Sequence, residues 1–163
     1  MKRILSFLSI LLALYIQGGT TAQTSREVSA IAKYEAIDGM LPTFQRIMQN
    51  EERLDKLCVS FEQVESGMNA KAYNKRENSV GILAIRPIMV REANRLLRLH
   101  DGIDYDYFTY DDRWDRSYAE LIFAVVQIHK NPSLDLTKAC VVWNCHGGQR
   151  YINKIKIAYK KTN

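Results

Sequence analysis

Glu65 is the side chain in this sequence whose spacing best suits acid–base chemistry. Residues 51–65 repeat apolar side chains every three or four positions, which predicts an amphipathic helix. Glu65 lies four residues after Phe61 and seven after Cys58, so it continues the apolar stripe at the end of that helix. Apolar surroundings disfavour the charged form of a carboxyl group and raise its pKa toward the range of a general acid.

A plainer interpretation is that Glu65 is a helix-end residue with no partner and no chemistry. Gly67 follows it where a helix stop is expected, because glycine tolerates the left-handed backbone found there. Glu62 points away from the apolar stripe, and we expect it to be solvated.

Three short motifs follow one another along the chain. They are Val64-Glu65-Ser66-Gly67-Met68-Asn69 with Ala72, then Ser-Val-Gly-Ile-Leu-Ala-Ile-Arg-Pro at 79–87, then Trp143-Asn144-Cys145-His146-Gly147-Gly148. Each motif alone is weak, because a pair such as Glu-Ser occurs by chance in many chains. In this order they resemble the catalytic-domain signature of lytic transglycosylases with a lysozyme-like fold. With the helices between them, the resemblance covers about residues 51–151.

The resemblance implies an enzyme that cleaves peptidoglycan between N-acetylmuramic acid and N-acetylglucosamine. In that family one glutamate protonates the leaving oxygen and then acts as base on the muramoyl 6-hydroxyl, which closes a 1,6-anhydro ring. The motif places this catalytic role on Glu65. Most glycosidases need two carboxylates, whereas this reaction needs one and no cofactor or metal.

The resemblance also implies six substrate-binding residues: Ser66, Gly81, Ala84, Ile85, Trp143 and Asn144. Ser66 would orient the glutamate or a substrate group, and Gly81 would let the backbone approach the sugar closely. Trp143 would offer a face to a sugar ring, and Asn144 an amide. Four of these residues have a plainer interpretation as well. Ser66 is then only a helix-end hydroxyl, Gly81 only serves a turn, and Trp143 only packs in the core. Asn144 then only accepts the special backbone angles after a helix.

Two positions depart from the family pattern. Ala84 stands where the family usually has a groove-lining glutamine, and Cys145-His146 stands where a small residue is usual. These departures leave a second possibility, a catalytically weak or inactive peptidoglycan-binding domain on the same fold. Acidic residues downstream leave a third, a hydrolytic lysozyme-type muramidase whose second carboxylate is Asp101, Asp104 or Asp106.

Helical patterns dominate the elements that must position these residues. Apolar spacing predicts helices over 88–99 and 136–143, and another that starts at Asp115 or Ser117. Residues 80–85 are a buried strand or a tight turn, and the C-terminal residues 151–161 fit either helix or strand. We therefore expect a mostly α fold of the α+β lysozyme-like kind. It would be a single compact helical domain with a short apolar strand or hairpin beside the active-site groove.

Residues 1–22 have the pattern of a secretory signal peptide. Lys2 and Arg3 precede the apolar run 4–16, and Thr20-Thr21-Ala22 supplies small residues for cleavage before Gln23. A membrane anchor is the alternative, but roughly 20 apolar residues are needed to span a bilayer. The sequence therefore predicts export to the periplasm or beyond, with residues 23–163 as one transglycosylase-like domain.

Composition limits the partners of the 163-residue chain. Apolar residues make up 47% and charged residues 25%, which is too apolar for a disordered protein. Loss of Lys2 and Arg3 with the signal peptide lowers the formal charge from +5 to +3. This mild positive charge favours an acidic polymer as partner and is no evidence for nucleic acid. The resemblance implies that the partner is the glycan strands of peptidoglycan. We expect a monomer with no membrane span in the mature chain.

The three cysteines offer no recognisable metal site. Cys58 lies on an apolar helical face and is expected in the core, and export would allow one pair of the three to oxidise. Cys140 and Cys145 lie near His146, but no fourth ligand follows at a known spacing. His100 and His129 are isolated in the sequence and are expected at helix ends or on the surface.

Overall fold

Most of the segments with apolar residues at helical spacing are helices in the structure. The computed structural model describes residues 41–162, so the expected signal peptide lies outside the described residues. The helices are α3 (Leu41–Gln49), α4 (Glu51–Glu65), α5 (Pro87–Asp101), the 3-10 helix η1 (Asp111–Trp114), α6 (Arg116–Lys130), α7 (Leu136–Trp143) and α8 (Gly148–Lys161). A small antiparallel sheet joins β1 (Tyr73–Asn74) to β2 (Ser79–Val80). The expected mostly α fold with a small strand pair is confirmed, and the C-terminal segment is a helix.

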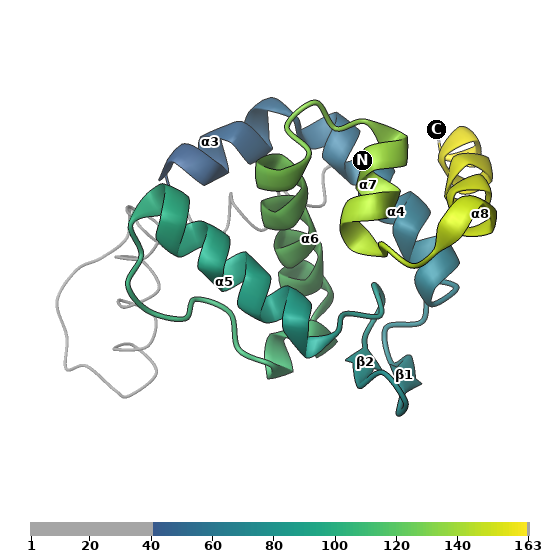
Figure 1. The fold of residues 1–163 in the computed structure, drawn as a ribbon, viewed down its shortest axis with the longest axis horizontal. Helices are drawn as coiled ribbons and strands as arrows, with labels where there is room; N and C mark the ends of the chain where they lie inside the picture. The colour runs from purple at the N-terminus through teal and green to yellow at the C-terminus, as the bar shows by residue number, and fades with distance from the viewer. Residues whose placement is uncertain (1–40, 163) are drawn as a thin grey trace, which may run out of the picture.

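Helix α6 forms the centre of the fold, with α3 and α5 on one side and α4, α7 and α8 on the other (Figure 1). Every residue from 121 to 128 is buried, so α6 has no solvent-facing stripe along these two turns. The ring of Phe123 on α6 lies 5.0 Å from Phe61 and 4.9 Å from Trp143, centroid to centroid. Aromatic packing thus joins α4, α6 and α7 directly beneath the end of α4.

Helix α6 begins at a side-chain cap. The Asp115 carboxylate accepts hydrogen bonds from the backbone N–H groups of Ser117 (2.8 Å) and Tyr118 (3.1 Å). Of the two residues that the sequence offered as caps, Asp115 therefore fills the position.

Residues 80–85 combine the two structures that the sequence left open. Val80 ends β2, pairing with Tyr73, and then forms an isolated antiparallel bridge with Ile85. The turn between them needs Gly81, whose φ is +77° and whose Cβ, if it had one, would overlap the Arg113 carbonyl. The polar residues 69–78 contain β1, a strand of two residues that is too short to show the alternation by which a sequence predicts a strand.

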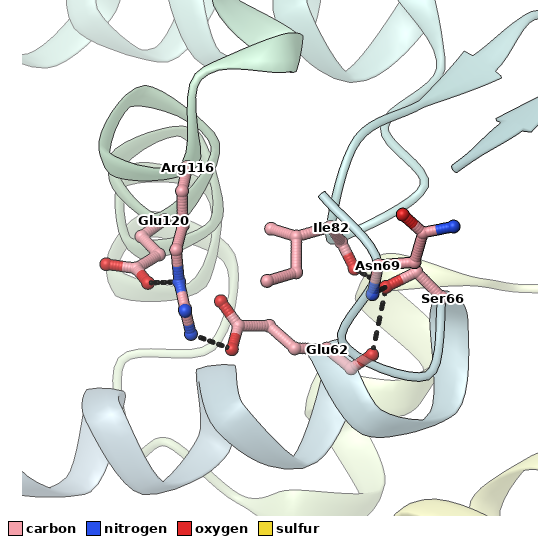
Figure 2. Close-up of polar contacts among 6 residues, drawn as sticks. All are labelled: Glu62, Ser66, Asn69, Ile82, Arg116 and Glu120. Atoms are coloured by element: carbon pink, nitrogen blue, oxygen red, sulfur yellow. Dashed lines mark hydrogen bonds and ion pairs between the residues drawn. The ribbon is translucent and has the colours of Figure 1, made fainter. Parts of the chain in front are cut away.

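Glu62 is fully buried, so the expectation that it is solvated is wrong. Figure 2 shows its carboxylate facing Arg116, whose Nη2 lies 2.5 Å from Glu62 Oε2 while its Nε donates to Glu120 at 2.8 Å. The error has a physical source: both α6 and α8 pack on α4, so a second face of α4 is covered. Burial raises the pKa of Glu62 and the guanidinium of Arg116 opposes that rise.

We predict that Arg116→Ala lowers the free energy of unfolding by about 3 kcal/mol, because it leaves a buried carboxylate without its cation. The matched control is Arg98→Ala, which breaks an exposed ion pair with Asp106 of 2.6 Å. That change should remove less than about 1 kcal/mol. Urea denaturation of both variants tests the contrast, and equal losses would show that Glu62 does not depend on Arg116.

His100 and His129 lie near the ends of α5 and α6, as expected, but they are not isolated in the fold. Their rings stack with centroids 4.2 Å apart. His129 Nε2 lies 2.9 Å from the hydroxyl of the buried Thr43, which itself donates to Asp101 at 2.5 Å. Burial, followed by the charges of His100 and Arg46, lowers the pKa of His129 to about 4.

This lowered pKa predicts an acid-sensitive fold. The unfolded chain binds a proton at His129 near pH 6.5, whereas the folded chain resists it down to about pH 4. The contribution to stability is therefore complete above pH 6.5 and declines as the pH falls from 6.5 toward 4. His129→Gln should show a shallower decline of unfolding free energy over this interval. A variant with the full wild-type decline would contradict the assignment.

Candidate active site

The three sequence motifs meet around one cavity of about 470 Å³. Its walls come from the end of α4, from the hairpin with the turn that follows it, and from the segment between α7 and α8. The lining residues are Val64, Glu65, Ser66, Gly67, Ala72, Tyr73, Asn74, Glu77, Ser79, Ala84, Arg86, Met89, Trp143, Asn144 and His146. Segments far apart in the sequence thus contribute to a single, mainly polar concavity.

Glu65 is the last residue of α4 and lies in the cavity wall. Burial raises its pKa, which agrees with the expectation from its apolar neighbours. Three smaller influences act on the same group: a hydrogen bond from Tyr151 and the charge of Arg86 lower the pKa, and the charge of Glu77 raises it. The net result is a raised pKa, which favours the protonated form of the Glu65 carboxyl relative to an exposed glutamate.

Tyr151 is the partner of Glu65 that the sequence analysis missed. Its hydroxyl donates to Glu65 Oε1 from the first turn of α8. The Tyr151 ring packs edge-on against Phe61, with centroids 6.3 Å apart. A Cβ at Gly147 would lie 2.6 Å from this ring, so the glycine makes room for it. An aromatic residue one turn after Gly147-Gly148 was the signal available in the sequence.

Ser66 fixes the chain where it leaves α4. Its hydroxyl donates to the carbonyl of Ile82 at 2.6 Å and accepts from the backbone N–H of Asn69 at 3.1 Å (Figure 2). These bonds tie the end of α4 to the 80–85 turn, so Ser66 holds Glu65 in place through the backbone. Ser66 also lines the cavity.

Four of the six expected substrate-binding residues reach the cavity: Ser66, Ala84, Trp143 and Asn144. Trp143 touches the cavity but is only 5% exposed and packs edge-on against Phe61 and Phe123, so core packing is the role that the structure shows. Ala84 has φ +47°, a left-handed conformation that strains any residue other than glycine. Such strain is found where a chain must turn sharply at a site.

Gly81 and Ile85 do not line the cavity. Gly81 is buried against the Arg113 backbone, so its missing side chain accommodates the protein and not a sugar. Ile85 is fully buried and bridges Val80. Both residues belong to the 80–85 turn, which carries the cavity-lining residue Ala84.

The acidic residues suggested for a second carboxylate lie elsewhere. Asp101 accepts hydrogen bonds from Thr43, and Asp106 pairs with Arg98, while Asp104 is absent from the cavity lining. Glu77, on the connection between the two strands, is the second carboxylate in the lining. Its position in a run of polar residues, 74–79, gives no sign in the sequence that it faces a cavity.

All three cysteines are free thiols. Cys58 is buried on α4, as expected for a core residue, Cys140 is buried and Cys145 is exposed. The departure from the family pattern at 145–146 brings His146, and not Cys145, into the cavity lining.

The chain was compared with protein-family models, curated proteins and solved structures. No protein-family model matches the chain, and no curated protein or solved structure is similar enough to match it. Among residues 41–162, no helix is long and apolar enough to cross a membrane.

We predict that Tyr151→Phe raises the pKa of Glu65, because the lost hydrogen bond stabilised the carboxylate form. Carbon-13 NMR titration of the glutamate side-chain carboxyls measures this directly, with Glu65→Gln identifying the signal. The control is Tyr159→Phe on the same helix, where the ring contacts Lys56 and not Glu65. An unchanged or lowered pKa in Tyr151→Phe would show that the bond does not act on Glu65.

Proposed function

We propose that this protein is an exported peptidoglycan lytic transglycosylase in which Glu65 is the only acid–base group. The observation that carries the proposal is the meeting of three separate motifs around a cavity with a partly buried carboxyl of raised pKa in its wall. The substrate would be the glycan strand of peptidoglycan, and the bond cleaved would join N-acetylmuramic acid to N-acetylglucosamine.

The proposed reaction uses the same carboxyl twice. Protonated Glu65 gives its proton to the glycosidic oxygen as that oxygen leaves the muramoyl C1. The resulting carboxylate then takes the proton of the muramoyl 6-hydroxyl. At the same time the oxygen of that hydroxyl bonds to C1 and closes the 1,6-anhydro ring. Glu65 ends as it began, protonated, and no water is consumed.

The surroundings of Glu65 suit both halves of this cycle. Burial favours the protonated form needed at the start. Tyr151, whose own pKa is raised by burial, keeps its proton and donates it in a hydrogen bond that stabilises the carboxylate formed midway. Asn74 and Asn144 offer amides in the same cavity for sugar hydroxyl and acetamido groups, whereas Ala84 offers only a methyl group.

A hydrolytic muramidase is the second candidate, and the position of Glu77 favours it. Glu77 lines the same cavity and its charge is felt by Glu65. A second carboxylate in such a position can activate a water molecule or stabilise the positive charge that develops at C1. In the transglycosylase mechanism Glu77 has no chemical role.

Substitution of each cavity carboxylate separates the two candidates. We expect Glu65→Gln to abolish release of soluble fragments from purified peptidoglycan, because an amide can neither give nor take the proton. Glu77→Gln should retain release within about tenfold, well short of the 10²- to 10⁴-fold contribution of a general acid or base. Glu52→Gln, on the exposed first turn of α4, is the matched control and should leave release unchanged.

Full activity in Glu65→Gln would refute both candidates. Loss of activity in both cavity variants would favour the muramidase. A wild-type protein that binds peptidoglycan and releases nothing would instead be an inactive binding domain, for which the missing amide at Ala84 offers a reason.

A further inference from the structure

Two large aromatic rings lie uncovered beside the cavity. Tyr73 on β1 lines the cavity with 59% of its surface exposed. Trp114, the last residue of η1, is 44% exposed and does not line the cavity. Their ring centroids are 6.3 Å apart with 39° between the planes, so Trp114 is the aromatic neighbour of a cavity-lining tyrosine.

The backbone beneath the two rings is firmly held. Arg113 is buried, and its Nη1 donates to the carbonyls of Asn78 at 2.9 Å and Ile85 at 3.2 Å. The carbonyl of Arg113 in turn packs against Gly81. These contacts fasten η1 to the hairpin, so the backbone segments that carry Tyr73 and Trp114 are held together while both side chains stay exposed. A surface ordered in advance binds a ligand with little loss of conformational freedom.

We propose that Tyr73 and Trp114 form a sugar-binding platform for the glycan strand, one subsite beyond the cavity. This inference rests on the proposed function, since it takes the polymer bound at Glu65 as the ligand. A cavity of about 470 Å³ can hold only a short part of a polysaccharide, so the rest of the strand must continue past the cavity mouth. The C–H face of a pyranose ring packs on an aromatic face, while its hydroxyl groups stay in water.

The surroundings of the platform favour a sugar over an apolar protein partner. Residues 75–78, which follow Tyr73, are Lys, Arg, Glu and Asn, and all four are exposed. Protein interfaces need a wider apolar centre than two rings provide. Tyr110 is also exposed but differs from the pair, because its hydroxyl accepts from Arg91 and Arg113 lies over its ring at 5.7 Å.

Binding of a defined oligosaccharide tests the platform without requiring catalysis. The probe is the β-1,4-linked hexamer of N-acetylglucosamine, titrated by calorimetry into protein that carries Glu65→Gln so that no bond is cleaved. We expect Trp114→Ala and Tyr73→Ala each to raise Kd about tenfold, the scale of one lost aromatic contact. Tyr73→Phe, which keeps the ring, should restore the affinity. Tyr105→Ala is the control, since this tyrosine is 45% exposed and lies outside the cavity lining.

The outcomes separate the platform from the proposed function. Weaker binding in the two alanine variants alone, with melting temperatures unchanged, supports the platform whether or not wild-type protein cleaves peptidoglycan. Equal affinity in all variants overturns the platform, and continued cleavage by wild-type protein would leave the transglycosylase standing. Failure of every variant to bind the hexamer also overturns the platform, because it removes the glycan as the ligand of these rings.

Discussion

The burial of the last turn of α4 is the constraint on which the site depends. Three contacts from three different parts of the chain hold this turn. Arg116 on α6 pairs with Glu62, the turn after the hairpin accepts the hydroxyl of Ser66, and Tyr151 on α8 donates to Glu65. A helix end is normally the place where a helix frays. Here each contact orders one residue of the end, and the cavity forms against it.

Two carboxyl groups three residues apart acquire different chemistry from this packing. Burial raises the pKa of both, but Glu62 faces a guanidinium and Glu65 faces a phenol. A guanidinium keeps its charge at every accessible pH, so Arg116 favours the charged form of Glu62, although burial still raises the pKa of this carboxyl to about 7. The phenol of Tyr151 is neutral and only donates a hydrogen bond, which leaves Glu65 free to exchange its proton with a ligand. Position relative to α6 and α8, more than residue type, thus separates a structural carboxyl from a candidate catalytic one.

Local patterns predicted the helices well because α4 and α7 each carry an apolar stripe that is buried in the core. Motif order also predicted that the end of α4, the 80–85 turn and the segment after Trp143 would meet. The sequence could not reveal that a second helix covers α4, which is why Glu62 was expected in solvent. Tyr151 and Glu77 were missed for a related reason: the contact of Tyr151 with Glu65 and the place of Glu77 in the cavity lining both depend on how separate segments pack together.

The chemical form of the sugar end released from peptidoglycan tests the central claim most directly. Mass spectrometry of the fragments released by the protein distinguishes a 1,6-anhydro-muramoyl end from a reducing end, since the anhydro form is lighter by one water. We expect anhydro ends from the wild-type protein, because in the proposed reaction the muramoyl 6-hydroxyl and not water would attack C1. Reducing ends would contradict it and would make the protein a hydrolase, in which Glu77 has a chemical role.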